Sequence, residues 1–182
     1  MRVFGLVGRS GSGKTTLIEA LLPRLRARGL AVSTMKHAHH GFEMDRPGKD
    51  SHRHRSAGAQ EVMVVSAERW VLAAETPGAS EPDVDALIER FAPVDLVLVE
   101  GFHRHSHPKI EVHRPALGKD MIWRPGSDIV AIAADVALHG VTVPVLDLGA
   151  PEAIVDFLVT ACAPLRRSRE GRDLRRAVAG RG

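Results

Sequence analysis

The stretch Gly8-Arg9-Ser10-Gly11-Ser12-Gly13-Lys14-Thr15, preceded by the apolar run Val3-Phe4-Gly5-Leu6-Val7, decides how this chain folds. It matches G-x-x-x-x-G-K-[ST] at every fixed position, a pattern typical of a phosphate-binding loop between a strand and a helix. Its three glycines permit backbone angles that turn successive N–H groups inward, which creates a concave site for an anion. The sequence therefore predicts a nucleoside triphosphate site near the start of the chain.

Two side chains of this loop carry the expected chemistry. Lys14 brings a full positive charge to the β- and γ-phosphates, and the hydroxyl of Thr15 can ligate Mg²⁺. The helix that begins near Gly13 directs the positive end of its dipole at the same anion. Apolar residues recur at helical spacing after the loop, at Leu17, Leu21, Leu22 and Leu25.

Strand and helix signals alternate along most of the chain. We predict a three-layer α/β domain with a P-loop NTPase fold, in which a mostly parallel sheet carries a small antiparallel hairpin extension. The expected strands are 3–7, 30–35, 96–99, 109–113, 129–133 and 143–146, the hairpin is 62–66 with 70–74, and the later helices are 51–57, 84–91 and 151–158. Residues 114–128 carry no regular pattern.

Length and charge predict one nucleotide-binding domain, residues 1–165, and a basic, flexible C-terminal tail, residues 166–182. Seven arginines against two acids give the tail a net charge of +5, so the whole-chain value of +3 leaves −2 for the domain. This distribution does not favour nucleic acid as a partner. No apolar run approaches the ~18 residues of a membrane helix. The single Cys162 suits a reducing compartment, and we expect a cytoplasmic protein.

A phosphate loop of this kind draws a second acid from the carboxyl end of a neighbouring strand, where it holds Mg²⁺ directly or through water. Asp95 precedes the buried run 96–99 and Glu100 follows it. Only Glu100 comes at the sheet edge where the phosphate loop lies. Thr15 and Glu100 are therefore the expected metal-side residues, and a solvated strand-end carboxylate is the alternative for Glu100.

Other polar residues leave alternatives open. Asp45 and Lys49 lie in the long loop 36–50, which either closes over a nucleotide or is an ordinary polar loop. The histidines cluster at 37–54 and 103–113, but no cysteine partner or HExxH pattern accompanies them, so polar loop residues are favoured over a metal site.

Asp135 follows the strand 129–133, where its carboxylate can either accept hydrogen bonds from guanine N1 and N2 or cap the next segment. The chain has no [NT]-K-x-D tetrapeptide, so base identity does not follow from the residues.

The blocks Lys36-His37-x-His39-His40-Gly41-Phe42 and Asp45-x-Pro47-Gly48-Lys49-Asp50-Ser51-x-Arg53-His54-Arg55 resemble one family, molybdopterin-guanine dinucleotide biosynthesis protein B (MobB). The likeness continues through Asp95 to Phe102 and Pro108 to Val112, and covers about residues 1–160. It implies a GTP-binding adaptor in molybdenum cofactor biosynthesis, a homodimer with at most a weak Mg²⁺-dependent GTPase activity. The implied partner is the guanylyltransferase that joins GMP to molybdopterin, and contact with molybdopterin itself stays open.

The resemblance assigns residues to this site. It implies a GTP site at Gly8, Arg9, Ser10, Gly11, Ser12, Gly13, Lys14, Thr15 and Thr16, with Glu100 as the acid on the Mg²⁺ side and Asp45 to Asp50 as the closing loop. Lys14, Glu100 and Asp45 are then the expected catalytic residues. Asp135 is the candidate contact to the base on its position alone, and the resemblance does not assign it. His52 stands where the family pattern predicts an aromatic residue. A small-molecule kinase that uses ATP and a metal-delivery GTPase are the alternative functions.

Overall fold

A computed structural model describes residues 1–38, 41–42, 44–78 and 82–161. The chain divides into two compact units, one made of Met1–His37 with the chain from Val84 onward, and the other of Ala38–Asp83. His39, His40, Cys162 and the predicted tail 166–182 lie outside the described residues, so the boundary expected at 165/166 stays a prediction. Among the described segments, no helix combines the length and hydrophobicity that a bilayer span requires.

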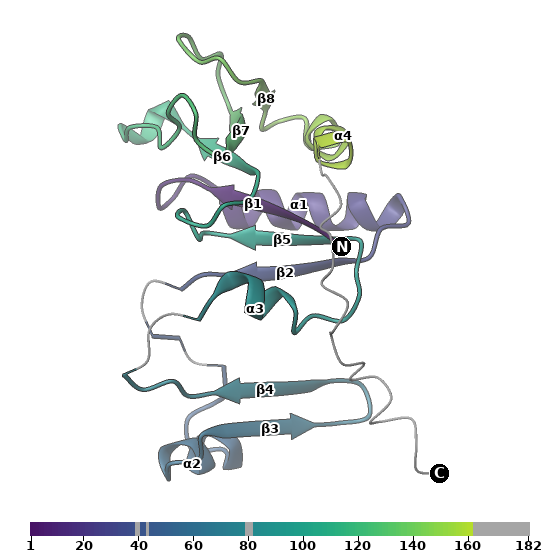
Figure 1. Ribbon diagram of the computed structural model, residues 1–182, viewed down its shortest axis with the longest axis vertical. Coiled ribbons are helices and arrows are strands. Elements are labelled where there is room, and N and C mark those ends of the chain that lie inside the picture. The colour runs from purple at the N-terminus through teal and green to yellow at the C-terminus, as the bar shows by residue number, and fades with distance from the viewer. Residues whose placement is uncertain (39–40, 43, 79–81, 162–182) are drawn as a thin grey trace. The chain divides into compact units, whose positions relative to one another are not determined.

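The first unit is built on a six-stranded parallel sheet. Its strand order is β2-β5-β1-β6-β7-β8, and every pair in it is parallel (Figure 1). The strands are β1 (Arg2–Val7), β2 (Val32–Lys36), β5 (Leu96–Glu100), β6 (Lys109–His113), β7 (Ile129–Ala134) and β8 (Val145–Asp147). Strand β5 is buried along its whole length and β7 at every position except Val130, as the continuous apolar runs in the sequence predict. The predicted α/β fold with a mostly parallel sheet is confirmed.

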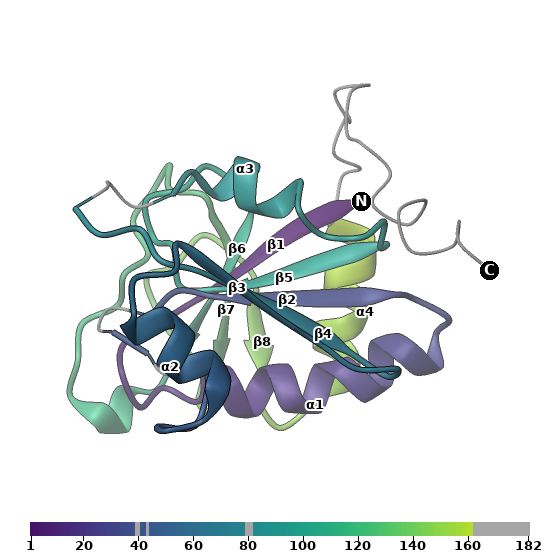
Figure 2. The same cartoon turned by 90° about the horizontal axis from the view of Figure 1, so that it is seen from below.

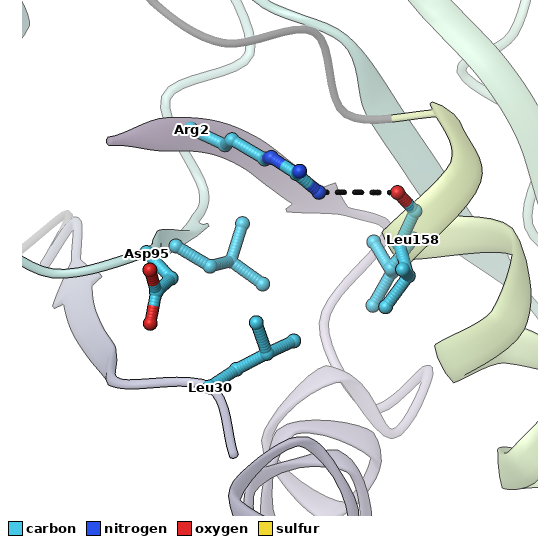
Figure 3. A pocket seen from close by; sticks show the side chains of 6 residues that line it. Arg2, Leu30, Asp95 and Leu158 are labelled. Carbon is cyan, nitrogen blue, oxygen red and sulfur yellow. Dashed lines mark hydrogen bonds between the residues drawn. The ribbon is translucent and has the colours of Figure 1, made fainter. Parts of the chain in front are cut away.

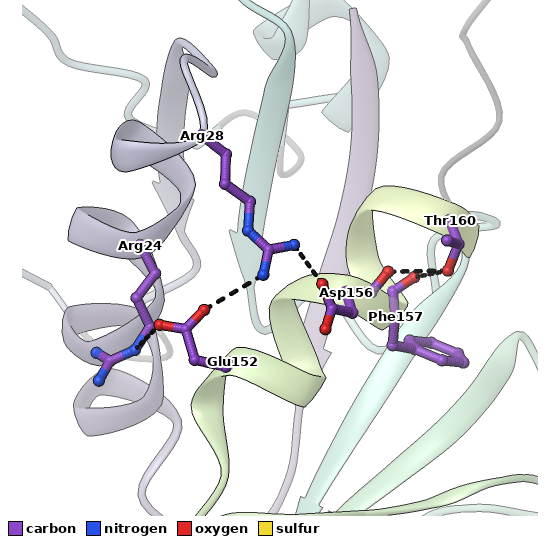
Figure 4. A network of polar contacts seen from close by, with 6 residues as sticks. All are labelled: Arg24, Arg28, Glu152, Asp156, Phe157 and Thr160. Atoms are coloured by element: carbon purple, nitrogen blue, oxygen red, sulfur yellow. Dashed lines mark hydrogen bonds and ion pairs between the residues drawn. The ribbon is translucent and has the colours of Figure 1, made fainter.

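Two helices cover one face of the sheet. Helix α1 (Lys14–Ala27) and helix α4 (Pro151–Ala161) bury Leu21, Leu25 and Leu158 against alternate strand residues such as Phe4 and Leu98. An ion-pair network joins the exposed sides of these helices (Figure 4). In it Glu152 pairs with Arg24 at 3.0 Å and Arg28 at 3.3 Å, and Arg28 also pairs with Asp156.

The opposite face is covered partly by a helix and partly by loops. Helix α3 (Val84–Ile88) packs Val84 and Ile88 on Val97 and Val99, and Figure 2 shows it on the face opposite α1. Beyond it, Trp123 and neighbouring loop residues pack on Val7 and Ile132. Here the sheet itself buries two charged residues of β6, Lys109 and Glu111.

Those two charges hold the covering loops in place. The carboxylate of Glu111 accepts the backbone N–H groups of Ile122 and Trp123, both at 2.7 Å. The ammonium of Lys109 donates to the carbonyls of His105 and His107, and lies 3.4 Å from Asp128 Oδ2. A buried charge requires such partners, because its desolvation is otherwise too costly. The irregular segment 114–128 is thus ordered by hydrogen bonds to the sheet, with one short 3₁₀ turn, η1 (Pro115–Leu117).

The second unit contains helix α2 (Asp50–Ser56) and the antiparallel hairpin of β3 (Glu61–Val65) and β4 (Trp70–Ala74). The hairpin forms a two-stranded sheet of its own. Arg55 of α2 pairs with Asp45 at 2.9 Å and with Glu75 at 3.1 Å, which ties the start and end of the unit together. The large apolar residues of the hairpin are exposed, among them Met63, Val64, Val65 and Trp70.

Element boundaries differ from the sequence expectation at a few ends. Strand β2 begins at Val32 instead of residue 30, and helix α3 ends at Ile88, where the expected helix continued to residue 91. Strand β8 is Val145–Asp147 instead of 143–146. Pro144 precedes it and has no N–H to donate to the sheet, although its carbonyl accepts from Ile132 N–H at 2.9 Å. None of these shifts moves a predicted site residue to the other edge of the sheet.

Candidate functional site

The phosphate loop connects β1 to α1 at the carboxyl edge of the sheet. Gly11 and Gly13 have φ values of 85° and 96°, in the left-handed region that glycine adopts without strain. Among the described residues, the N–H groups of Gly11 and Gly13 have no hydrogen-bond partner, and no side chain caps α1. A folded loop with unused donors at a helix N-terminus fits an anionic ligand.

Gly8 shows why the loop requires glycine at its first position. A Cβ there would lie 2.4 Å from the carbonyl oxygen of Val112 and 2.7 Å from Ser12 Oγ. Both distances are too short for any side chain, and the φ of 151° adds strain for a non-glycine residue. Ser12 is 2% exposed, and its hydroxyl has no partner among the described residues. The loop is therefore packed tightly against the end of β6.

Lys14, the first residue of α1, lies over this loop. Its ammonium donates to the carbonyls of Gly8 at 2.8 Å and Arg9 at 3.2 Å. Burial lowers the pKa of Lys14 from its ordinary value of 10.5, while the nearby charge of Glu100 acts in the opposite direction. The positive charge is thus held next to the unused N–H groups, as the sequence motif predicts.

The structure brings Thr15 and Glu100 together. Thr15 Oγ1 donates to Glu100, with its two carboxylate oxygens at 3.1 and 3.3 Å. Glu100 ends β5 beside Leu6 of β1, at the edge that carries the phosphate loop. A hydroxyl and a carboxylate in this position are oxygen ligands of the kind that Mg²⁺ prefers. These two residues are the ones that would hold the metal.

The other acid of this strand, Asp95, lies at the opposite edge of the sheet. Its carboxylate accepts the N–H of Ala31 at 2.8 Å, and it lines a small pocket with Arg2, Leu30 and Leu158 (Figure 3). Arg2 there donates to the carbonyl of Val159 at 3.1 Å. Asp95 is thus engaged in joining strands, and the choice of Glu100 over Asp95 agrees with the topology.

Lys36 is a residue that sequence reasoning did not select. It ends β2, directly beside Glu100, and its ammonium lies 3.3 Å from Glu100 Oε1. With Lys14, it places two cations around one carboxylate at the phosphate-loop edge. In the sequence, Lys36 directly follows a predicted strand and opens one of the blocks that carry the family resemblance, but neither feature gives it a role.

Asp135 follows β7 at the same edge and does not stand alone. Arg114, the first residue after β6, pairs with Asp135 Oδ2 at 2.8 Å and donates from Nε to the carbonyl of Ser12 at 3.1 Å. Lys119 donates to the carbonyl of Ser10 at 3.0 Å, and Arg9 donates to the carbonyl of Asp120 at 3.2 Å. The segment after β6 therefore lies against the outer side of the phosphate loop. Nothing in the sequence pattern pointed to Arg114 or Lys119.

The remaining predicted residues lie elsewhere. Thr16 is exposed on the first turn of α1. Asp45 belongs to the second unit, where it pairs with Arg55. His105 and His107 meet through their Nδ1 atoms at 2.9 Å, and the ring of His37 stacks on Phe102 with centroids 4.5 Å apart. His107 Nε2 is buried with no hydrogen-bond partner among the described residues, and the preference for polar loop histidines over a metal site stays a prediction.

With this geometry established, comparison with known proteins identifies the family. The family model for molybdopterin guanine dinucleotide synthesis protein B matches residues 3–135. The chain belongs to the MobB family. The matched region includes the phosphate loop, Glu100 and Asp135.

Curated and solved members of this family cover nearly the same length. The molybdopterin-guanine dinucleotide biosynthesis adapter protein of Escherichia coli is 41% identical over 82% of this chain and 87% of its own length. The adapter protein of the same name from Haemophilus influenzae is 40% identical over 86% of each chain. The crystal structure of Bacillus subtilis MobB superposes with a TM-score of 0.69 at 28% identity, covering 90% of this chain and 99% of that one.

Proposed function

We propose that this chain is a GTP-binding adaptor of molybdenum cofactor biosynthesis that assists the guanylyltransferase joining GMP to molybdopterin. The observation that carries the proposal is the phosphate loop, in which the free N–H groups of Gly11 and Gly13 lie beside Lys14 and the Thr15–Glu100 contact. The printed names of the relatives supply the pathway and the adaptor role. A single Cys162 agrees with a cytoplasmic setting.

Different groups at the phosphate loop are proposed to bind the phosphates and the metal ion. Backbone N–H groups and Lys14 bind the phosphate oxygens, while Thr15 and Glu100 hold Mg²⁺, which neutralises charge between the phosphates when it is bound. Lys36 neutralises Glu100 in the absence of the metal. If Glu100 held the metal, Lys36 would no longer be needed to neutralise that carboxylate, and its ammonium would be available to a phosphate oxygen.

Hydrolysis by this site is proposed to be weak. Of the acids at the phosphate-loop edge in the described part of the first unit, Glu100 is already engaged by Thr15 and Lys36, and Asp135 is paired with Arg114. Asp45, the other acid expected near the γ-phosphate, is paired with Arg55 in the second unit. A carboxylate that other side chains already engage is a poor general base, which suits an adaptor better than a fast enzyme.

We also propose that two copies associate through the β3–β4 hairpin. Its two strands pair only with each other in the described chain, so both outer edges offer unpaired backbone groups. Met63, Val65 and Trp70 are each more than half exposed, an unusual concentration of apolar surface. Sedimentation of wild type and of Val65→Lys tests this: a monomer in both, or a dimer in both, contradicts a hairpin interface.

Calorimetric titration with GTP and with ATP, each with Mg²⁺, tests the nucleotide assignment. We expect GTP to bind at least tenfold more tightly, which corresponds to about 1.4 kcal/mol. Lys14→Ala removes a half-buried charge outside the apolar core and should abolish binding while leaving the fold intact. Unchanged affinity in that variant would contradict the site, and a preference for ATP would favour the small-molecule kinase.

The adaptor role needs its own measurement. Purified guanylyltransferase is assayed for GMP transfer to molybdopterin with and without this chain, and with the Lys14→Ala variant as the matched control. We expect stimulation by wild type and a clear loss of stimulation with Lys14→Ala. Equal stimulation by both proteins would separate the adaptor role from nucleotide binding.

A further inference from the structure

We propose that Arg114 couples recognition of the guanine base to the phosphate loop, as a positioning residue that makes the chain selective for guanine nucleotides. The inference rests on the proposed function, in which the phosphate loop binds GTP, and on the sequence-based prediction that Asp135 contacts the base. It adds a specificity role for a residue that no motif marks.

The first step concerns what Arg114 does to the loop. Its Nε donates to the carbonyl of Ser12 at 3.1 Å, and the carbonyl of Ser12 belongs to the same peptide unit as the N–H of Gly13. In a trans peptide the C=O and N–H bonds point in opposite directions. A cation bound to the outer C=O therefore polarises an N–H that faces inward, and the hydrogen bond this N–H gives to an anion becomes stronger.

Lys119 repeats this arrangement two peptides earlier. Its ammonium donates to the carbonyl of Ser10 at 3.0 Å, and that carbonyl shares a peptide unit with the N–H of Gly11. Gly11 and Gly13 are among the loop residues whose N–H groups have no partner in the described chain. Two cations thus bind the carbonyls of two peptides whose N–H groups are free to bind an anion.

Arg114 differs from Lys119 in having a second partner. Its Nη1 pairs with Asp135 Oδ2 at 2.8 Å, so one guanidinium joins the phosphate loop to the acid at the end of β7. Its Nε and Nη2 also lie 3.6 Å from the position of a Cβ on Gly13, which places the guanidinium directly against the loop. No contact between Lys119 and Asp135 is present in the described chain.

This bridge suits arginine and guanine in particular. A guanidinium has a planar array of five N–H donors, so it can hold two acceptors in different directions, whereas an ammonium is a compact point charge. The pairing orients Asp135 through Oδ2 and leaves Oδ1, and a further lone pair of Oδ2, to accept N1–H and the 2-amino group of guanine. Adenine presents no such pair of donors at these positions, so a carboxylate held there favours guanine.

The coupling follows from the shared guanidinium. A base bound to Asp135 fixes the Arg114 side chain, and a fixed Arg114 keeps the Ser12–Gly13 peptide polarised towards the phosphates. Removing Arg114 should therefore weaken GTP more than ATP, because ATP does not use the Asp135 end of the bridge. Removing Lys119 should weaken both nucleotides equally.

The test measures the dissociation constants of GTP and ATP, both with Mg²⁺, for wild type, Arg114→Gln, Arg114→Lys, Lys119→Gln, Asp135→Asn and the double variant Arg114→Gln/Asp135→Asn. We expect Arg114→Gln to reduce the GTP-to-ATP preference at least fivefold and Lys119→Gln to leave it unchanged. Asp135→Asn should remove the preference, and the double variant should lose no more than Asp135→Asn alone. Arg114→Lys keeps the charge but cannot hold both acceptors, so it should resemble Arg114→Gln.

The outcomes separate the inference from the proposed function. If the wild type does not prefer GTP over ATP, Asp135 does not recognise guanine, and the proposed role of the Arg114 bridge is overturned as well. A wild type that prefers GTP, with the preference unchanged in Arg114→Gln, overturns the bridge alone. Full preference in Arg114→Lys, or additive losses in the double variant, also overturns it. Thermal unfolding of each variant establishes that the binding changes occur in folded protein.

Discussion

A buried histidine makes the stability of the first unit depend on pH. His107 is 7% exposed on the sheet face opposite α1, and its ring covers Gly5, where a Cβ would lie 2.5 Å from His107 Nε2. Burial lowers the pKa of His107 from 6.5 to about 4, and the charges of Lys109 and His105 act in the same direction. Asp128 is the facing group that opposes them.

The direction of the effect follows from which state takes up the proton first. The unfolded chain binds a proton at His107 as the pH falls through 6.5, whereas the folded chain does so only near pH 4. Folding is therefore fully stabilised above pH 6.5 and loses stability as the pH falls towards 4. The slope is about 1.4 kcal/mol per pH unit, and the accumulated loss at pH 5 is about 2 kcal/mol.

Urea unfolding between pH 5 and pH 8, followed by the fluorescence of the buried Trp123, measures this effect. His107→Asn keeps a polar group at the position of Nδ1 but cannot titrate, so the difference in unfolding free energy between wild type and this variant should change by about 2 kcal/mol over the range. His139→Asn, at an exposed histidine, is the matched control and should give a curve parallel to wild type. Parallel curves for wild type and His107→Asn would refute the reasoning.

Three further substitutions test the core of the site. Gly8→Ala places a Cβ 2.4 Å from the Val112 carbonyl, so we expect a loss of about 3 kcal/mol or more in unfolding free energy together with loss of GTP binding, measured by denaturation and calorimetry. Glu111→Gln replaces one of the two accepting oxygens with an NH₂ group, so one backbone N–H faces another donor in a fully buried site. We expect the unfolding free energy measured by urea denaturation to fall by about 2–4 kcal/mol. An unchanged unfolding free energy would show that packing alone holds the loop 119–124. Glu100→Gln should reduce Mg²⁺-dependent hydrolysis in a phosphate-release assay more than it reduces GTP affinity, and equal losses would mean that Glu100 is structural.

Much of the first unit was predictable because its signals are local. The phosphate-loop motif predicts a strand before it and a helix after it. In a parallel sheet, the carboxyl ends of the other strands then lie at the same edge as this loop. This is why Thr15 and Glu100, 85 residues apart, could be paired from the sequence. The burial of β5 follows equally from four consecutive apolar residues.

The residues that sequence reasoning missed are those whose partners are distant and unpatterned. Arg114 and Lys119 contact loop carbonyls 102 and 109 residues away, and a backbone carbonyl leaves no trace in the sequence. Lys109 and Glu111 alternate with apolar residues in β6, a pattern typical of a strand with one solvated face. Both are fully buried instead, since loops cover that face where a helix is absent.

The loop-covered face and the phosphate loop are parts of one arrangement. Glu111 holds the backbone at Ile122 and Trp123, and the same segment carries Lys119 and Asp120 against the outer side of the phosphate loop. A helix on this face would bury apolar side chains but would leave the Ser10 and Ser12 carbonyls without these cations. Burying the Glu111 carboxylate costs stability, but it holds the irregular segment after β6 in place. Arg114 and Lys119 of that segment can then polarise the anion-binding peptides of the phosphate loop.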